Sequence, residues 1–321
     1  MKRVDFDYPE FFAGITALMR TAQGIVPRRL SDGAIAFCTA LEKVKGARAR
    51  GGAGIRLRAY SNAETVTIRL RLYSTSAETC VMTLMDAAGT CERRQFADDA
   101  ELSWDLPQGN DRFTIFFPWQ GEVEVTDLRI SEGAYFRPVP ETDGKRWLFI
   151  GDSITQGMEA EFPERSFAAL LAQKLGADFR NCGVGGLKLE PEFVREALNG
   201  SFDAVMLAFG VNDASLKTPL SKFEENARSV MENLSAQKTS VFVLTPLYWP
   251  DESEPGILEK YREVLRRTAA DFPGVGILEG DSLLPHDRKY FADGVHPNED
   301  GMAILAENLW KTLMAANRVE G

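Results

Sequence analysis

Histidine and cysteine are scarce in this chain of 321 residues, which contains 2 histidines and 4 cysteines. So few cysteines exclude a disulfide-stapled scaffold, and no Cys-X-X-Cys pair or cysteine/histidine cluster indicates a zinc site. We therefore expect reduced thiols and no bound metal. Any mechanism that needs a histidine base must use His286 or His296.

The sequence also lacks a long apolar run and a surplus of basic residues. No apolar stretch approaches the roughly 18 residues of a membrane span, and acidic residues interrupt Met1–Asp7, where a signal peptide needs an apolar core. The net charge is -10, from 37 Lys and Arg against 47 Asp and Glu, so a nonspecific phosphate-binding surface has no electrostatic support. We expect a cytoplasmic protein that binds neither nucleic acid nor membranes.

The composition and length favour two folded domains. Hydrophobic residues make up 44% and charged residues 26%, as in soluble globular proteins, and a domain has about 150 residues. Apolar and polar residues alternate in Gly54–Tyr73, and similar short strands recur up to Ile130, separated by turn-rich segments. Residues 1–140 are therefore predicted to form an antiparallel, jelly-roll-like β-sandwich.

Residues 141–321 show a different pattern, which begins after a predicted linker at Pro138–Gly144. Apolar runs alternate with amphipathic helical stretches, which predicts a parallel sheet with helices on both faces. The predicted strands are Trp147–Ile150, Ala177–Cys182, Ala204–Phe209, Val241–Leu244 and Val275–Leu278. The predicted helices are Pro163–Leu175, Glu190–Leu198, Leu220–Ala236, Gly256–Phe272 and Glu299–Ala315.

Two polar motifs have the residue types of nucleophilic catalysis. GDSIT begins at Gly151 and places Ser153 just beyond a strand, where open parallel sheets bind ligands. A helix N-cap or a Ser/Thr turn is the alternative. DGVHP places Asp293 three residues before His296, a spacing that lets a carboxylate orient an imidazole base. An Asx turn with an exposed histidine is the alternative here.

Two further loops follow the second and third predicted strands. NCGVGG begins at Asn181, and GVND begins at Gly210. Glycine-turn N–H groups and the amide of Asn212 can stabilise an oxyanion without losing a proton, whereas a tight turn or helix N-cap is the alternative for each loop. Four coincidental turns are a poor explanation of four such motifs, so we favour one shared site.

In order and spacing, GDSIT, NCGVGG, GVND and DGVHP resemble the motifs of the SGNH (GDSL-type) hydrolases across residues 146–315. The resemblance implies a flavodoxin-like three-layer α/β/α fold and ester hydrolysis without a metal or organic cofactor. By motif position, it implies Ser153 as the nucleophile, His296 as the base and Asp293 as the residue that orients the base.

The same resemblance implies an oxyanion hole made by the backbone N–H groups of Ser153 and Gly186 and the side chain of Asn212. Gly185 is the alternative to Gly186. More loosely, Gly54–Leu72 and Phe113–Trp119 resemble the β-sandwich of two-domain carbohydrate esterases of this superfamily. That likeness implies a carbohydrate-binding or accessory role for the first domain.

Other polar side chains compete for these roles. His286 is the rival base because Asp287 follows it, but adjacent side chains in an extended loop point apart, so we expect a surface histidine. Asp213 is the rival to Asp293, and we expect it to cap the backbone that follows it. We expect Asp152 to stabilise its own loop.

Tyr248 and Trp249 follow the fourth predicted strand, where they can stack on a sugar, wall an acyl pocket or simply anchor the loop. We expect a serine esterase that hydrolyses short-chain carboxylic esters, foremost O-acetyl groups on carbohydrates, in small-molecule or oligosaccharide substrates. The alternatives are a lipid esterase, lysophospholipase or thioesterase of the same superfamily, and a catalytically silent glycan-binding protein. The full set of Ser, Asn, Asp and His argues against the silent protein.

Overall fold

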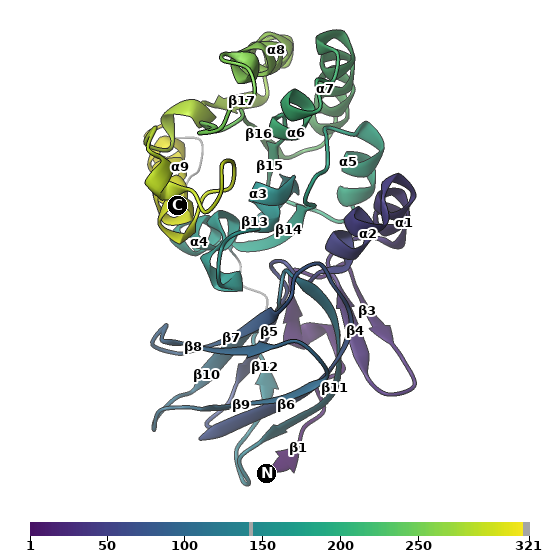
Figure 1. Cartoon of the computed structure of the whole chain (residues 1–321). Coiled ribbons are helices and arrows are strands. Elements are labelled where there is room, and N and C mark those ends of the chain that lie inside the picture. The colour runs from purple at the N-terminus through teal and green to yellow at the C-terminus, as the bar shows by residue number, and fades with distance from the viewer. Residues whose placement is uncertain (141–143, 317–321) are drawn as a thin grey trace. The chain divides into compact units, whose positions relative to one another are not determined.

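The computed structural model describes residues 1–140 and 144–316, which fold into two compact units (Figure 1). The linker predicted at Pro138–Gly144 includes residues 141–143, which lie outside the described residues. From the sequence, Phe162–Glu164 were expected in the second domain, but these residues belong to the first unit. There, Arg93 pairs with Glu164 at 2.7 Å, and the Arg93 guanidinium lies 3.7 Å from the ring centroid of Phe162.

The first unit is built on two antiparallel sheets, which confirms the predicted β-sandwich. One sheet has the order β3 (Ala17–Arg20), β4 (Ile25–Arg28), β11 (Gly121–Ile130), β6 (Thr65–Thr75) and β9 (Ala100–Asp105), with β1 (Lys2–Arg3) paired to β11. The other has the order β12 (Arg137–Pro138), β5 (Arg56–Tyr60), β10 (Arg112–Phe116), β7 (Cys80–Asp86) and β8 (Cys91–Phe96), with β2 (Phe12–Ala13) paired to β5. Apolar side chains of both sheets form one core.

Helices α1 (Asp32–Leu41) and α2 (Lys43–Arg50) lie between β4 and β5 in the chain, and neither was predicted from the sequence. Ser31 caps α1 because its side chain accepts the N–H of Ala34 at 3.0 Å. Helix α1 is short and mostly apolar, so its pattern of apolar residues cannot be distinguished from that of a buried strand. A short 3₁₀ helix, η1 (Pro9–Phe11), precedes β2.

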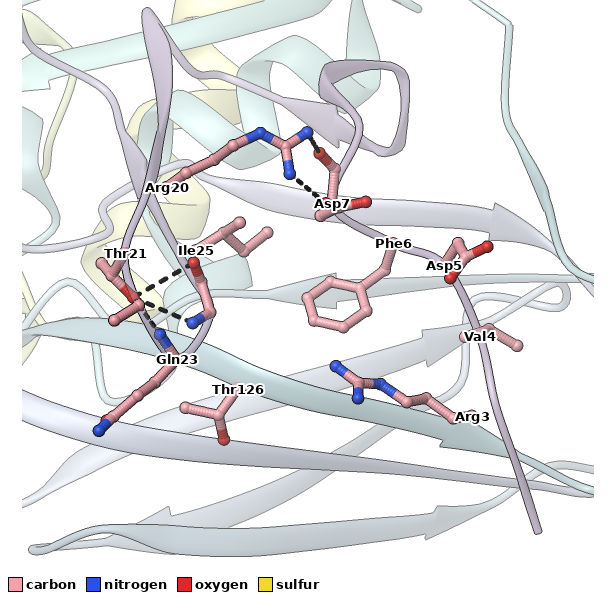
Figure 2. A pocket seen from close by; sticks show the side chains of 12 residues that line it. Arg3, Val4, Asp5, Phe6, Asp7, Arg20, Thr21, Gln23, Ile25 and Thr126 are labelled. Atoms are coloured by element: carbon pink, nitrogen blue, oxygen red, sulfur yellow. Dashed lines mark hydrogen bonds and ion pairs between the residues drawn. The ribbon is translucent and has the colours of Figure 1, made fainter.

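A polar cavity of about 330 Å³ lies in the first unit, between the N-terminal segment and the β3–β4 hairpin (Figure 2). Arg20 crosses its rim and donates to the backbone oxygen of Asp7 at 2.7 Å. Thr21 accepts the N–H of Gly24 at 2.9 Å and so closes the hairpin. None of the four motifs contributes a residue to the lining of this cavity.

The second unit contains a parallel sheet, as predicted. Its strands are β14 (Asp178–Gly183), β13 (Arg146–Gly151), β15 (Ala204–Ala208), β16 (Ser240–Leu244) and β17 (Val275–Leu278), in that spatial order. In chain order this is 2-1-3-4-5, the flavodoxin-like arrangement, and the fold class is confirmed. The buried apolar residues of these strands explain why they were easy to recognise from the sequence.

Helices cover both faces of this sheet (Figure 1). On one face α4 (Phe167–Lys174) packs against α9 (Glu299–Ala315), and on the other α7 (Leu220–Ser235) packs against α5 (Pro191–Ala197) and α8 (Ile257–Ala269). The remaining elements are α3 (Ser153–Gln156), α6 (Val211–Ser215), η2 (Pro163–Arg165), η3 (Gly280–Ser282) and η4 (Arg288–Tyr290). Within 1–140 and 144–316, no helix has the length and apolarity that crossing a membrane requires.

Candidate active site

The carboxyl ends of three neighbouring strands form the floor of the site. Gly151 at the end of β13 pairs with Gly183 of β14 on one side and with Ala208 of β15 on the other. The motifs GDSIT, NCGVGG and GVND continue from these three ends. Their loops are therefore brought together at the edge where open parallel sheets bind ligands.

Ser153 begins α3, directly after β13, and its side chain is almost completely buried. Asp152 caps this helix because its Oδ1 accepts the N–H of Ile154 at 3.0 Å. This confirms that Asp152 stabilises its own loop. A Cβ at Gly183 would lie 2.2 Å from the backbone nitrogen of Gln156, so only glycine lets β14 pass so close to α3.

A hydrogen-bonded chain joins Ser153, His296 and Asp293. Nε2 of His296 lies 2.8 Å from Oγ of Ser153, and its Nδ1 lies 2.7 Å from Oδ2 of Asp293. An ionised carboxylate only accepts hydrogen bonds, so it selects the imidazole tautomer with the proton on Nδ1. In that tautomer Nε2 is left to accept the serine proton, which is the arrangement a serine nucleophile needs.

The second oxygen of Asp293 shapes the loop. Oδ1 accepts the N–H groups of Val295 at 2.8 Å and His296 at 2.7 Å, which forms an Asx turn. Partial burial alone would raise the pKa of Asp293, but the His296 backbone N–H, the His296 imidazole and the Val295 N–H together outweigh it. The pKa of Asp293 is therefore lowered from its ordinary value, and the carboxylate is ionised at neutral pH.

The loop that carries Asp293 and His296 is closed on itself. The N–H of Ala292 donates to the backbone oxygen of His296 at 2.9 Å, and Phe291 forms a β-bridge with Pro297. Gly294 accepts a hydrogen bond from the N–H of Asp251 at 3.2 Å. These bonds hold the imidazole in place before any substrate arrives.

The two candidate glycines of the oxyanion hole differ in what their N–H groups do. The N–H of Gly185 donates to Oε1 of Gln156 at 2.7 Å. Gly186 has φ 78°, and no hydrogen bond of its N–H occurs among the described residues. This difference favours Gly186 over Gly185 as a donor to an incoming ligand.

Asn212 lies on α6, beyond the end of β15. Its Nδ2 donates to the backbone oxygen of Leu187 at 3.1 Å. A side-chain amide has two N–H groups, so this bond fixes the orientation of Asn212 and leaves one donor for a ligand.

Asp213 caps backbone, but not the segment we expected. Its Oδ2 accepts the N–H of Leu189 at 3.0 Å, 24 residues earlier in the chain. The expectation that it caps the backbone following it was wrong, because the loop after β14 runs beside α6 and supplies the donor. Asp213 contacts neither Ser153 nor His296 through any hydrogen bond of the described residues, so it does not replace Asp293.

Two buried carboxyl groups lie behind the nucleophile. Burial, together with the negative charge of Asp213, raises the pKa of Asp152 to about 7. Burial also raises the pKa of Asp213 to about 6, against the lowering effects of its bond from Leu189 and of the Lys188 charge. Near neutral pH these two carboxyl groups are therefore partly protonated, whereas exposed carboxyl groups are ionised.

The rival base, His286, makes its contacts with residues other than the nucleophile. Nε2 of His286 lies 3.0 Å from the backbone oxygen of Asp281, and its ring stacks on Tyr248 with centroids 4.1 Å apart. Asp287 pairs with Lys289 at 2.9 Å rather than with His286. The expected surface histidine is thus confirmed: about half of its side chain is exposed.

Tyr248 and Trp249 are both partly buried. Tyr248 stacks on His286 and meets Phe291 edge-on, with the Tyr248 and Phe291 ring centroids 5.9 Å apart. The backbone oxygen of Trp249 accepts the N–H of Glu252 at 3.2 Å. These contacts match the loop-anchoring alternative, and substrate binding by the two aromatic residues stays a prediction.

Sequence reasoning did not identify Gln156 or Asn226. Gln156 is buried and accepts the N–H of Gly185, and Asn226 of α7 donates to the backbone oxygen of Leu189 at 2.8 Å. A signal existed for Asn226, because it is a polar residue on the apolar face of an amphipathic helix. In the described part of the chain, no group of three or more His, Cys, Asp or Glu side chains is arranged to hold a metal ion.

Comparison with known families gives one match. Residues 149–304 match the GDSL-like Lipase/Acylhydrolase family. The matched segment contains all of the motifs described above, from Ser153 to His296. A search of curated proteins found no significant match.

Solved structures resemble the chain over most of its length. A salicylyl-acyltransferase, SsfX3, from a tetracycline biosynthetic pathway has a TM-score of 0.83 and 19% identity, covering 95% of this chain and 94% of that chain. A putative GDSL-like lipase from Bacteroides ovatus has a TM-score of 0.78 and 16% identity, covering 96% of each. A family two carbohydrate esterase from Clostridium thermocellum, in complex with cellohexaose, has a TM-score of 0.65 and 16% identity, covering 83% and 93%. At these identities, the likeness establishes the fold.

Proposed function

We propose, from the premise that residues 149–304 belong to the GDSL-like Lipase/Acylhydrolase family, that the protein is a serine esterase that removes short acyl groups, foremost acetyl groups, from carbohydrates. The observation that carries the proposal is the hydrogen-bonded chain from Ser153 through His296 to Asp293. A silent binding protein has no need of this chain, because glycan recognition does not require an activated hydroxyl group.

The hydrogen bonds that join Ser153, His296 and Asp293 suit acylation of the serine. His296 takes the proton of the Ser153 hydroxyl on Nε2 while Oγ attacks the ester carbonyl, and Asp293 stabilises the imidazolium that forms. The carbonyl oxygen becomes an oxyanion that the N–H groups of Ser153, Gly186 and Asn212 are suited to bind. When the tetrahedral intermediate collapses, the imidazolium gives its proton to the leaving alcohol.

Deacylation reverses the roles. His296 takes a proton from a water molecule as the water attacks the acyl group on Ser153. The tetrahedral intermediate then releases the carboxylic acid, and the imidazolium returns its proton to Oγ of Ser153. Every proton is carried by His296, so the reaction needs no metal or organic cofactor. The same acyl-enzyme can also react with an alcohol, and measuring free acid when an alcohol is present separates hydrolysis from acyl transfer.

Two considerations support the carbohydrate acetyl ester as the substrate class. The two-domain architecture is that of a carbohydrate esterase whose structure contains cellohexaose. The sequence shows no long apolar segment that would serve as an acyl-chain lid. The first consideration concerns the alcohol half of the ester and the second the acyl half. Ser153, His296 and Asp293 by themselves do not select either half.

The first experiment tests the nucleophile. Ser153→Ala should lower the turnover of a synthetic acetyl ester by about 10⁴-fold or more, and an organophosphonate should label the native protein at Ser153 but not the variant. Hydrolysis by Ser153→Ala at the native rate would refute the assignment. Labelling with no hydrolysis of any ester would indicate a different acyl donor.

The second experiment tests the substrate class. Activity should fall steeply from acetyl to butyryl to octanoyl esters, and acetylated oligosaccharides should release acetate. A rise in activity with chain length would instead indicate the lipid esterase. Preference for acetyl thioesters over oxygen esters would indicate the thioesterase.

A further inference from the structure

We propose that Asn226, on helix α7, is a positioning residue for the oxyanion hole, which acts by fixing the backbone that follows Gly186. This inference rests on the proposed function, because it assigns a role in stabilising the oxyanion of an ester. It concerns a residue outside all four motifs, on a helix that contributes no group to the chain of Ser153, His296 and Asp293.

Three side chains hold the segment that follows Gly186. Asn212 donates to the backbone oxygen of Leu187 at 3.1 Å, and Asp213 accepts the N–H of Leu189 at 3.0 Å. Asn226 completes the set by donating to the backbone oxygen of Leu189 at 2.8 Å. Both backbone groups of Leu189 are thus bound by side chains, one from α6 and one from α7.

The position of Asn226 within α7 shows that packing alone does not explain it. The helix buries Phe223, Ala227, Val230 and Leu234 on one face, and Asn226 lies on that face with only 7% of its surface exposed. A buried amide costs free energy unless it is hydrogen-bonded, so an apolar residue would serve helix packing at least as well. The bond to Leu189 is what an apolar residue at this position does not supply.

Only a short backbone segment separates the Asn226–Leu189 bond from Gly186. Gly186 adopts φ 78° within a turn that the Leu187 N–H closes by donating to the backbone oxygen of Val184 at 3.1 Å. Glycine adopts positive and negative φ about equally readily, so its own preference does not fix this conformation, and the segment 187–189 that follows helps to hold it. The same segment carries the Leu187 oxygen that orients the Asn212 amide. Loss of the Asn226 bond therefore loosens two donors of the oxyanion hole together.

An oxyanion exists in the transition state but not in the bound ester. A misplaced donor therefore lowers kcat more than it changes KM. Removal of a whole oxyanion donor costs about 10² to 10³ in kcat, which sets the upper limit for a residue that only positions donors. We expect Asn226→Leu to lower kcat about 10- to 100-fold, with KM changed by less than about threefold.

Asn308 provides the matched control. It lies on α9, is partly buried, and donates through Nδ2 to a loop carbonyl, that of Leu283, at 2.9 Å. Asn308→Leu removes the same kind of bond from a segment that carries no oxyanion donor, so kcat should stay within about twofold of the native value. Denaturant unfolding of both variants shows whether each remains folded under assay conditions.

Two further measurements separate positioning from a general loss of structure. A boronic acid that forms a tetrahedral adduct with Ser153 should bind Asn226→Leu more weakly by the same factor as kcat falls. Combining Asn226→Leu with Asn212→Ala should cost less than the product of the single effects, because both act on one oxyanion hole. Asn226→Ser, which is polar but too short for the bond, should show the same pattern if the leucine variant does not fold.

The outcomes are distinguishable from failure of the proposed function. If the native protein hydrolyses no ester and Ser153 resists phosphonate labelling, the proposed function fails. If the native protein is active but Asn226→Leu retains full kcat, or loses activity no more than Asn308→Leu, the positioning role is overturned. A rise in KM without a fall in kcat overturns it as well.

Discussion

Replacing Asp293 with asparagine should lower kcat/KM by about 10⁴-fold without unfolding the protein. In the structure the two carboxylate oxygens have separate tasks. Oδ1 accepts the backbone N–H groups of Val295 at 2.8 Å and His296 at 2.7 Å, and Oδ2 faces Nδ1 of the imidazole at 2.7 Å. An asparagine side chain has one oxygen and one NH₂ group, so it can satisfy only one of these two sites.

The hydrogen-bond count decides which site keeps the oxygen. Two backbone bonds at about 0.5–1.5 kcal/mol each outweigh one bond to the imidazole, so the amide oxygen of the Asp293→Asn variant stays in the Asx turn and its NH₂ group faces Nδ1. Nδ1 must then accept, which moves the ring proton to Nε2. An Nε2 that carries a proton does not accept the hydroxyl proton of Ser153, and about 5.5 kcal/mol of transition-state stabilisation is lost.

The assay compares Asp293→Asn with Asp287→Asn on one acetyl ester. Asp287 also accepts a backbone N–H two residues on, from Lys289 at 3.0 Å, and pairs with the Lys289 ammonium at 2.9 Å, but no histidine depends on it. Its variant should retain activity within about twofold, as surface substitutions usually do. If Asp293→Asn keeps more than about a tenth of native kcat/KM, the tautomer argument is wrong.

Two further predictions concern residues at the floor of the site, Asp152 and Gly183. The pKa of Asp152 is raised to about 7 when folded, so its contribution to stability is fully present below its unfolded pKa and is lost as pH rises toward 7. Asp152→Asn keeps the helix cap and should therefore unfold at a higher denaturant concentration than the native protein at about pH 8. Between about pH 5 and pH 8 its unfolding free energy should fall less than that of the native protein. If the unfolding free energies of the two proteins depend on pH in the same way, the prediction is wrong. Gly183→Ala places a Cβ 2.2 Å from the backbone of α3 and should cost about 1–3 kcal/mol of unfolding free energy together with activity. Gly274→Ala, with open space around its Cβ, should change neither, and equal effects of the two would show that the close approach is unimportant.

The parallel sheet was predictable from the sequence because its strands are buried on both faces. Segments such as Ala204–Ala208 are continuous apolar runs, and the alternation with helices restricts the topology to a few arrangements. Helix α9 was predicted with the bounds that the structure has, since Asn298 caps it and accepts the N–H of Gly301 at 3.0 Å. Local signals of this kind do not depend on distant parts of the chain.

Features that depend on distant contacts were not predictable. The placement of Phe162–Glu164 in the first unit depends on Arg93, 71 residues away from Glu164 along the chain. The bond from Asn226 to Leu189 joins residues 37 apart, and no local pattern encodes its partner. The sequence shows that a buried amide needs a partner, but only the fold identifies which carbonyl accepts.

The alternatives that the motifs presented were not mutually exclusive, and the structure shows why. Asp293 forms the Asx turn with one oxygen and bonds to the His296 imidazole with the other, so the turn residue is also a member of the hydrogen-bonded set Ser153, His296 and Asp293. Asn212 likewise binds the backbone oxygen of Leu187, in the loop after β14, with one N–H and keeps a second for a ligand. Such backbone bonds hold each side chain rigid and leave its other polar atom available, which is the preorganisation that an oxyanion hole and an oriented base require. Evidence for a cap or turn at a polar motif therefore does not count against catalysis there.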